Sequence, residues 1–479
     1  MSVLATLMPG FDGTELPEWV EQRLRDGMGG VCLFVSNVES VEQLRRLTDQ
    51  IREANPQAII SIDEEGGDVS RLYQREGSPF PGNAVLGRLD DPEVTRAVGE
   101  QVGRELALAG INVTLAPSVD INCNPRNPII GVRSFGAHAD LVSKHGVAWT
   151  EGVQSQAVAA NAKHFPGHGD TIHDSHHVEA LVNADLATLR ERELAPFAAA
   201  IDAGVLTIMT SHSLVPVLDP DNVATFSRPI LVDLLREQMG FDGVVITDAL
   251  NMAGASGAIG IPAAAVKSLV GGCDLLCIGP SVTEDELDEI VQAIDDALEA
   301  GELDQARVAD AARRNSQLAA QLAQLAAHVT PDERPLGTVQ GLETVALRET
   351  FAVSADARAR LSARAASGAP VHWIKFESTP NIAVGEGAWG PFAAGSEAQT
   401  VVRQGDVLDV SALPSDALIV AVGKDNHRHE WIREAIDAIR PWSPVVVDMG
   451  WPEPAEPYVD IATYGASRAV GTALKELVE

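Results

Sequence analysis

Eight short apolar runs, separated by amphipathic segments, dominate the first 330 residues of this 479-residue chain. The segments between them have helical periodicity, as at 41–54 and 284–301. The runs lie at 2–8, 31–35, 58–62, 111–117, 161–165, 205–210, 243–247 and 273–279. Unbroken apolar strands joined by helices are typical of a parallel sheet covered on both faces. Eight such units predict an α/β fold of the (β/α)₈ TIM-type barrel class. The alternative is an open doubly wound sheet, but no Gly-rich dinucleotide fingerprint follows an early run.

A smaller domain is expected after the barrel. The polar, proline-containing stretch 331–341 is typical of a linker, which predicts a catalytic barrel over 1–330 and an α/β sandwich domain over 342–479. Three apolar runs of this second domain predict strands, at 369–376, 417–423 and 443–450. Segment 429–440 predicts a helix between the last two. Trp389, in a glycine-rich segment, is the tryptophan we expect to face a ligand.

The charge balance narrows the class of partner. Lys and Arg number 35 against 68 Asp and Glu, a formal net charge of −33. Such a field repels nucleic acids and anionic lipid surfaces, so we expect neither as a partner, whereas a neutral sugar would not feel it. The N-terminus lacks the features of a signal peptide, and no window resembles a membrane span. The four cysteines form no CxxC pair and predict buried free thiols in a reducing, cytoplasmic compartment.

Polar residues follow four of the apolar runs of the barrel. Asp63 follows one run, His164 lies near the end of a second, His212 follows a third and Asp248 a fourth. Active sites of such barrels lie at the carboxyl ends of the strands. The sequence therefore predicts that these side chains converge on one rim.

The stretch 163–177, KHFPGHGDTIHDSHH, holds five of the twelve histidines of the chain. A metal site would draw on these imidazoles together with Asp170 or Asp174, but no HExxH helix is present and the glycines indicate an irregular loop. The other interpretation is a general acid/base. Asp174 precedes His176 by two residues and is placed to orient its ring and raise its basicity. A serine hydrolase is disfavoured because the chain has no GxSxG elbow.

Asp248 directly follows the apolar run of FDGVVITDAL. A carboxylate at that place either caps the next helix or points into the barrel mouth as a nucleophile that forms a covalent glycosyl intermediate.

Several further side chains suit a carbohydrate. Asp63 accepts and Arg71 donates hydrogen bonds of the kind that sugar hydroxyls make, and Arg133 and Lys163 add donors, although a surface salt bridge would also explain either. The adjacent Asp63–Glu64 pair suggests an alternative mechanism, in which the acetamide group of the substrate assists its own cleavage. That mechanism is disfavoured because a separate nucleophile candidate exists.

Five motifs, in this order along the chain, resemble those of the β-N-acetylglucosaminidases of glycoside hydrolase family 3. They are IDEEGGDVSRL (62–72), NPIIGVRSFG (127–136), AKHFPGHGDT with DSH (162–176), TFSRPILVDLLREQMGFDGVVITDAL (225–250) and GCDLLCIG (272–279). The resemblance covers residues 1 to about 330 well and the remainder more loosely. The block from KHFPGHG to DSH is its most specific part.

The resemblance implies a retaining exo-β-N-acetylglucosaminidase that acts on terminal N-acetylglucosaminides by double displacement, with no metal and no organic cofactor. Asp248 would be the nucleophile, His176 the acid/base and Asp174 its partner. The implied substrate contacts are Asp63, Arg71, Arg133, Lys163 and His164. Two positions depart from the family pattern. Asp68 replaces a common arginine, and HHVEALV follows DSH where a proline usually occurs.

The acceptor of the second half-reaction stays open at this point. A histidine base, unlike a carboxylate, does not repel phosphate, so phosphorolysis to a sugar phosphate is the alternative to hydrolysis. Other rivals are a metal-dependent barrel hydrolase, a non-catalytic sugar-binding protein, and a family 3 β-glucosidase that takes its acid from Glu386. The aglycone is equally open among cell-wall fragments of peptidoglycan recycling, chitin oligosaccharides and glycoconjugates. The oligomeric state is also open.

Overall fold

The computed structural model describes residues 3–171, 180–330, 332–452 and 457–479. Its residues group into two compact units. We call the first, Met1–Glu65 with Pro92–Ile130 and Gly136–Thr338, the barrel unit. The second consists of Gly66–Asp91, Gly131–Phe135 and Val339–Glu479, and we call it the sandwich unit.

Eight parallel strands form the core of the barrel unit within its described residues. They are β1 (Leu7–Pro9), β2 (Gly30–Leu33), β3 (Ile59–Ile62), β6 (Val113–Thr114), β7 (Asn161–Phe165), β9 (Thr207–Thr210), β12 (Val244–Ile246) and β13 (Leu276–Gly279). Parallel ladders join β1 to β13, β2 through β3 to β6, and β7 through β9 to β12. Bridges Val113–Ala159 and Ile246–Leu275 connect these ladders, and the amide of Gly29 donates to the carbonyl of Leu4 beside β1 and β2. Each of the eight predicted apolar runs thus holds or overlaps one strand of the ring.

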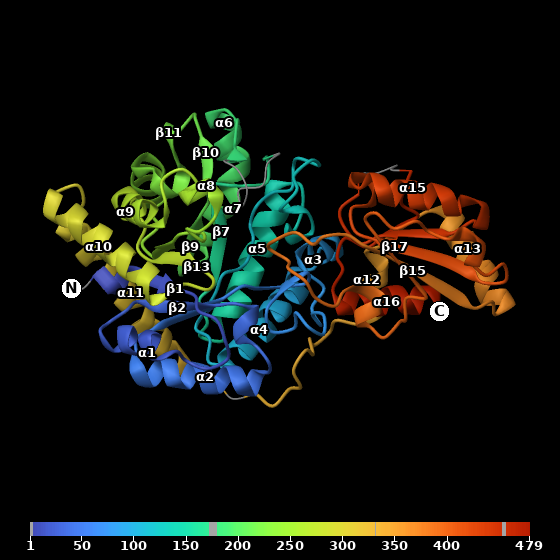
Figure 1. Ribbon diagram of the computed structural model, residues 1–479, viewed down its shortest axis with the longest axis horizontal. Helices are drawn as coiled ribbons and strands as arrows, with labels where there is room; N and C mark the ends of the chain where they lie inside the picture. The colour runs from blue at the N-terminus through green and yellow to red at the C-terminus, as the bar shows by residue number, and fades with distance from the viewer. Residues whose placement is uncertain (1–2, 172–179, 331, 453–456) are drawn as a thin grey trace. The chain divides into compact units, whose positions relative to one another are not determined.

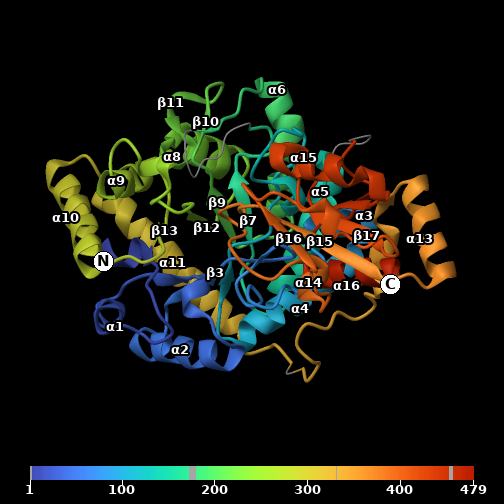
Figure 2. The same cartoon turned by 45° about the vertical axis from the view of Figure 1, so that its right-hand side comes forward.

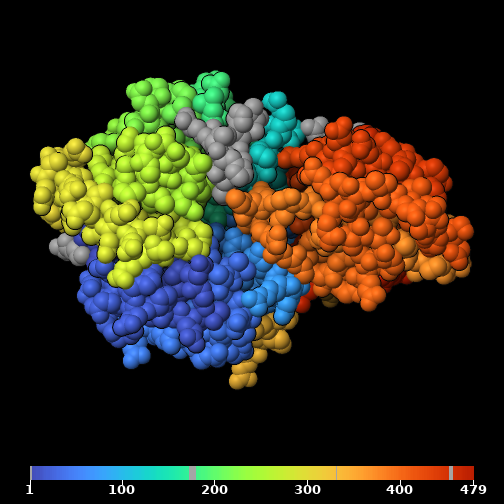
Figure 3. Space-filling view, in the orientation of Figure 1, coloured from blue at the N-terminus to red at the C-terminus, as the bar shows by residue number. Residues whose placement is uncertain are grey.

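Helices surround these strands (Figures 1 and 2). The helices of the barrel unit are α1 (Glu18–Arg25), α2 (Val41–Ala54), α4 (Pro92–Leu108), α5 (Ala139–Gln154), α6 (Leu186–Thr188), α7 (Ala195–Asp202), η6 (Pro229–Gln238), α8 (Ala253–Ser256), α9 (Ile261–Gly271), α10 (Glu284–Ala300) and α11 (Gln305–Ala326). Their ends follow local chemistry: Thr283 and Glu286 form a capping box at the start of α10, and Gly301 ends it in the left-handed conformation. The yellow segment that includes α10 lies on the outer surface (Figure 3).

The barrel strands are buried along their whole length, which explains why their sequences are apolar without alternation. Inward-facing side chains such as Met8, Ile59 and Met209 form one cluster with Leu318 and Leu322 of α11. Short additional strands lie in the connections: β4 (Glu64–Gly66), β5 (Val69–Ser70), β8 (Ala180–Leu181), β10 (Ser213–Val215) and β11 (Asp219–Val223).

The sandwich unit is built on one sheet of six strands in the described part of the chain, in the order β14-β19-β18-β17-β15-β16. The strands are β14 (Ala352–Val353), β15 (Val371–Glu377), β16 (Thr400–Arg403), β17 (Leu418–Gly423), β18 (Val445–Asp448) and β19 (Ile461–Ala462). Only β14 is antiparallel to its neighbour. The helices are α3 (Asn83–Leu89), α12 (Thr344–Glu349), α13 (Ala355–Ser367), α14 (Gly390–Ala393), α15 (Glu430–Ile439) and α16 (Arg468–Val478).

Alternate residues of this sheet pack into two hydrophobic cores, one on each face. Trp373 and Val420 pack in one cluster with residues of α12, α13 and α16, whereas Ile374 and Ile419 pack in another with α15. Both faces are therefore covered, which makes this unit an α/β sandwich. The three predicted strands and the predicted helix of this region correspond to β15, β17, β18 and α15.

Two segments that precede the predicted linker pack within the sandwich unit. Helix α3 carries Gly87, where a Cβ atom would overlap the carbonyl oxygen of Phe135. The neighbouring Arg88 donates from Nε to the carbonyl of Thr350 at 2.7 Å and lies 3.8 Å from the ring centroid of Tyr464. Residues 66–91 and 131–135 thus belong to the sandwich unit, although most of that unit is formed by residues 339–479.

Among the described residues, no helix combines the length and the apolar character needed to cross a bilayer. All four cysteines are free thiols, and Cys32, Cys273 and Cys277 are buried.

Candidate active site

A buried lysine connects two strand ends of the barrel unit. Lys163, in β7, has only 3% of its side chain exposed, and its Nζ lies 2.8 Å from Oδ1 of Asp63 and 2.8 Å from Oε1 of Glu65. Glu65 is as buried as the lysine, whereas Asp63 keeps 21% of its side chain exposed. Because the ammonium group of Lys163 bridges the two carboxylates, Asp63 is held in a fixed position at the rim with an exposed face. The sequence had proposed Asp63 and Lys163 separately as sugar contacts; the fold brings them together.

His164, the next residue of β7, is held by an aspartate from another strand end. Its Nδ1 lies 2.6 Å from Oδ2 of Asp120, a carboxylate that is 1% exposed. The same carboxylate accepts a hydrogen bond from the backbone amide of His168 at 2.7 Å. Burial alone would raise the pKa of Asp120, but the charge and hydrogen bond of His164, with the contacts of His168, lower it to about 2. Asp120 therefore fixes the imidazole of His164 from below the rim.

Sequence reasoning did not single out Asp120. The signal was present: Asp120 follows the apolar run 111–117 by three residues, in a strand-end position like those of Asp63 and Asp248. His168 was considered only as a metal ligand. It is buried, its Nδ1 lies 2.8 Å from Oγ1 of Thr171, and burial, followed by the charge of His164, lowers its pKa to about 4. His168 is therefore a buried, neutral imidazole at neutral pH.

Asp248 follows β12 and is half-buried. Its Oδ1 accepts a hydrogen bond from the amide of Ala249 at 2.8 Å. His212, from the end of β9, donates from Nε2 to the carbonyl of Ala249 at 3.1 Å and contacts Thr225 through Nδ1 at 2.8 Å. The residue after Asp248 is thus tied to the neighbouring strand end, and this restricts the orientation of the carboxylate.

The carboxylates of Asp63 and Asp248 both act on the thiol of Cys277, a buried residue of β13. A hydrogen bond to Cys32 and burial raise the pKa of Cys277 well above its usual range, and the negative charges of Asp248 and Asp63 raise it further. Both carboxylates therefore lie within electrostatic reach of one side chain of β13. Strand ends of β3, β7 and β12 contribute polar groups to one rim, as the sequence predicted.

The two predicted arginine contacts belong to the sandwich unit. Arg71 donates from Nη2 to the carbonyl of Ala383 at 2.8 Å and from Nη1 to that of Val384 at 3.3 Å. Arg133 is buried, and its carbonyl accepts a hydrogen bond from Nδ2 of Asn83 at 2.6 Å. The guanidinium of Arg71 is thus bound to carbonyl groups of its own unit, and the backbone of Arg133 is held there by Asn83.

The predicted acid/base pair, Asp174 and His176, falls within 172–179 and lies outside the described residues.

A cluster with metal-ligand chemistry also occurs in the described part of the barrel unit. Ligand atoms of Cys123, Asp170 and Glu193 lie within 4.8 Å of one another. The guanidinium of Arg192 already contacts Asp170 at 2.6 Å and Glu193 at 2.6 Å. Burial raises the pKa of Glu193 to about 7 against the opposing charge of Arg192, and burial together with the charge of Glu193 raises that of Cys123 to about 12. A cation of the protein occupies this cluster, and its thiol is protonated, so it is poorly suited to a metal ion.

Known proteins share both units. The Paenibacillus sp. str. FPU-7 protein described as a glycoside hydrolase family 3 beta-N-acetylglucosaminidase superposes with a TM-score of 0.85 at 28% identity, over 99% of this chain and 95% of its own. Beta-N-acetylhexosaminidase from Beutenbergia cavernae is 30% identical with a TM-score of 0.60, over 66% of this chain and 97% of its own.

Curated relatives carry similar names. Beta-hexosaminidase A of Pseudoalteromonas piscicida is 34% identical over 347 residues. The match covers 67% of this chain but only 58% of the length of that relative. Beta-hexosaminidase of Chromobacterium violaceum is 36% identical over 280 residues, 57% of this chain and 78% of its own. The model of the glycosyl hydrolase family 3 N terminal domain matches residues 11–318. The chain therefore belongs to glycosyl hydrolase family 3, which confirms the resemblance drawn from its motifs and makes it a glycoside hydrolase.

Proposed function

We propose that this protein is a retaining exo-β-N-acetylglucosaminidase that releases terminal β-linked N-acetylglucosamine by double displacement. The observation that carries the proposal is the buried Lys163–Asp63–Glu65 network, next to the fixed His164, on the rim that also holds Asp248. The names of the relatives support N-acetylglucosaminides as the substrate class. A cytoplasmic location belongs to the same proposal.

In the first half-reaction the Asp248 carboxylate attacks the anomeric carbon of the sugar. The bond between this carbon and the glycosidic oxygen breaks, and that oxygen takes a proton from His176, whose ring Asp174 orients. The sugar is then held as an ester on Asp248. The leaving group departs as an alcohol.

In the second half-reaction the now neutral His176 removes a proton from water as its oxygen attacks the same carbon. The ester bond to Asp248 breaks, and the sugar leaves with its original anomeric configuration. Two inversions at one carbon give net retention. Atoms and charges balance without any cofactor.

Asp63, Lys163 and His164 would bind the hydroxyl groups of the terminal sugar, together with Arg71 and Arg133. The rigid network suits this task, since the ammonium of Lys163 holds the Asp63 acceptor in place before the sugar arrives. Such preorganisation favours one sugar orientation with C1 toward the nucleophile.

The test is release of p-nitrophenol from its β-N-acetylglucosaminide. Asp248→Asn should lower kcat by at least about 10³-fold because it removes the nucleophile. Asp242→Asn, an exposed aspartate six residues earlier, is the matched control and should keep wild-type activity. His176→Ala should give a rapid burst followed by slow turnover, since an activated leaving group needs little acid assistance but water still needs a base. Full activity in Asp248→Asn would refute the proposal.

The same assay separates the remaining alternatives. A hydrolase releases free N-acetylglucosamine at a rate independent of phosphate, which is the expected result. Acceleration by phosphate with a sugar 1-phosphate as product would identify a phosphorylase. Activity that is lost on dialysis against a chelator and restored by a divalent metal would identify a metal-dependent hydrolase.

A further inference from the structure

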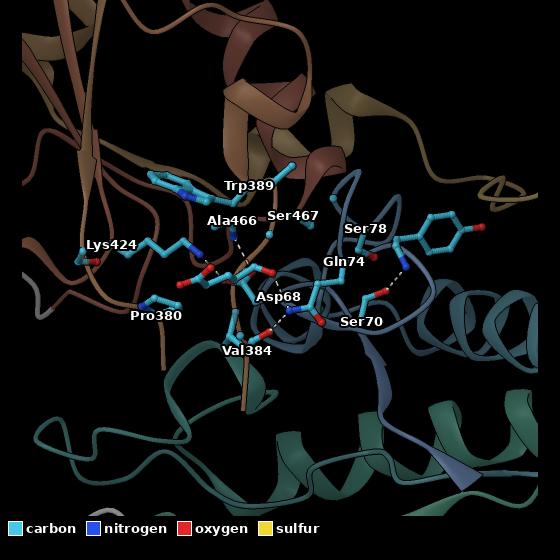
Figure 4. A pocket seen from close by; sticks show the side chains of 18 of the residues that line it. Asp68, Ser70, Gln74, Ser78, Pro380, Val384, Trp389, Lys424, Ala466 and Ser467 are labelled. Atoms are coloured by element: carbon cyan, nitrogen blue, oxygen red, sulfur yellow. Dashed lines mark hydrogen bonds and ion pairs between the residues drawn. The ribbon is translucent and has the colours of Figure 1, made fainter. Parts of the chain in front are cut away.

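The sandwich unit contains a cavity of about 560 Å³ formed entirely by its own residues (Figure 4). Its walls come from segment 67–78, from the connection after β15 that ends at Trp389, from Lys424 after β17, and from Ala466 and Ser467 before α16. The volume lies within the range of small-molecule sites.

The order of the strands in the sheet independently predicts a ligand site at the same position. Numbered along the chain from β15 to β19, the parallel strands stand in the order 2-1-3-4-5, so the direction of winding reverses between β15 and β17. In open α/β sheets, ligands bind in the crevice at the carboxyl ends of the strands that flank such a reversal. The cavity is lined by Glu377, the last residue of β15, and by Lys424, which follows the last residue of β17.

Four charged side chains of the cavity lining form ion pairs, Lys424 with Asp68 and Arg403 with Glu377, and the exposed Glu386 adds a further carboxylate. Nζ of Lys424 lies 3.7 Å from Oδ2 of Asp68, and Figure 4 shows the two side chains pointing toward each other. Glu377 contacts Nζ of Lys375 at 2.5 Å and Nη2 of Arg403 at 2.8 Å. A phosphate or carboxylate ligand would meet the carboxylates of Asp68 and Glu377, so the balance favours a neutral polar ligand that both donates and accepts hydrogen bonds.

Two aromatic side chains, Trp389 and Tyr73, are among the described residues that line the cavity. Trp389 is half-buried, and the ammonium groups of Lys424 and Lys375 lie 4.8 and 5.1 Å from its ring centroid. An aromatic face that attracts ammonium groups also attracts the polarised C–H bonds of a pyranose ring, because their hydrogen atoms carry partial positive charge. Hydroxyl and amide side chains of Ser70, Gln74 and Ser78 also line the cavity.

We propose that this cavity is a second binding site, which takes a neutral saccharide unit. Its lining contains none of the barrel residues assigned to catalysis, and binding there requires no step at Asp248. It is linked to one expected sugar contact within its own unit, because the carbonyl of Val384 accepts hydrogen bonds from both Arg71 and Gln74. Asp68, which departs from the family pattern, stabilises the wall of this cavity by accepting a hydrogen bond from the amide of Ala466 at 2.7 Å.

The test uses the full chain with Asp248→Asn, titrated calorimetrically with N,N′,N″-triacetylchitotriose. Two equivalents should bind. Adding Trp389→Ala should reduce the stoichiometry to one or weaken one site at least tenfold. Lys424→Met, which keeps the aliphatic stem but removes the ammonium group, should weaken the same site while preserving the fold. Trp442→Ala, a half-buried tryptophan that packs with α15, is the matched control and should leave both sites intact.

Unchanged binding in the Trp389→Ala and Lys424→Met chains, each with a wild-type circular dichroism spectrum, would overturn the inference. Kinetics provide a second readout. Because the site takes a saccharide of its own, Trp389→Ala should leave kcat/KM unchanged for both the trisaccharide and the p-nitrophenyl glycoside. A loss of kcat/KM confined to the trisaccharide, together with one equivalent bound by the Asp248→Asn chain, would also overturn the inference. Failure of the nucleophile assignment would appear separately, as release of N-acetylglucosamine from the trisaccharide by Asp248→Asn, which is measured before the titration.

Discussion

At the scale of single residues, the site depends on buried charges that are paired across strand ends. Lys163 neutralises Glu65, a carboxylate with only 2% of its side chain exposed. Removing one member of such a pair leaves the other buried without its counter-charge, and this costs more than the pair itself contributes.

Lys163→Met should therefore lower the free energy of unfolding by roughly 3–5 kcal/mol. It should also abolish most of the activity on the p-nitrophenyl glycoside, since Asp63 loses the group that holds it. Urea denaturation together with the kinetic assay measures both effects. Lys144→Met, an exposed lysine on α5, should change neither. A stable and active Lys163→Met chain would remove the network from the mechanism.

The depressed pKa of Asp120 predicts a stability change at acid pH. Its value of about 2 in the folded protein lies below the ordinary 3.8. The contribution to stability is therefore fully present above about pH 4 and disappears as the pH falls through 2, and it amounts to about 2 kcal/mol.

Asp120→Asn should be less stable than wild type at pH 7 by at least this amount, and the difference should shrink between pH 4 and pH 2. Denaturant titrations across this range measure the difference. The exposed Asp202→Asn serves as the control and should follow wild type throughout. A constant gap between Asp120→Asn and wild type would contradict the pairing with His164.

At the scale of elements, the close packing of α4 on α5 depends on glycines. A Cβ on Gly99 would lie 2.5 Å from the carbonyl oxygen of Trp149, and one on Gly103 would lie 2.7 Å from that of Val153. From the other side, a Cβ on Gly152 would overlap the carbonyl oxygen of Arg96. Backbone meets backbone along this contact, so a side chain cannot move aside to make room.

Gly152→Ala should lower the free energy of unfolding by about 1–3 kcal/mol, even though alanine is the better helix former. The neighbouring Glu151→Ala, exposed on the same helix, should be close to neutral. Thermal unfolding of the two variants provides the comparison. If Gly152→Ala is the more stable, the two helices have room to separate.

At the scale of the whole molecule, the net charge of −33 acts on substrates before they bind. A neutral glycoside has no net interaction with this field, whereas an anionic one is repelled, and salt screens the repulsion.

We expect kcat/KM for p-nitrophenyl β-N-acetylglucosaminide to change less than about twofold between low and high salt. The value for a glycoside with a carboxylate on its leaving group should rise several-fold over the same range. Steady-state kinetics in sodium chloride measures both. An anionic substrate that is favoured at low salt would indicate a local positive field at the site.

Much of the fold followed from local pattern. Buried parallel strands must be apolar on both faces. The runs that form β2, β3, β7 and β12 could therefore be recognised from the single sequence. The location of Asp63 and Asp248 just after β3 and β12, and of His164 near the end of β7, followed from the same pattern, because each apolar run shows where its strand ends.

The sequence by itself thus determined the strand count, the rim that carries the polar residues, and the family to which the chain belongs. Tertiary structure alone decided the pairing of Lys163 with Asp63 and Glu65, and the role of Asp120 beneath His164, because these partners are brought together by strand neighbours far apart in the chain. It likewise decided that segments 66–91 and 131–135, with Arg71 and Arg133, pack in the sandwich unit. The anchoring of segment 66–91 rests on contacts such as those of Arg88 with the carbonyl of Thr350 and of Asp68 with the amide of Ala466, and packing between distant segments leaves no periodic signal in a single sequence.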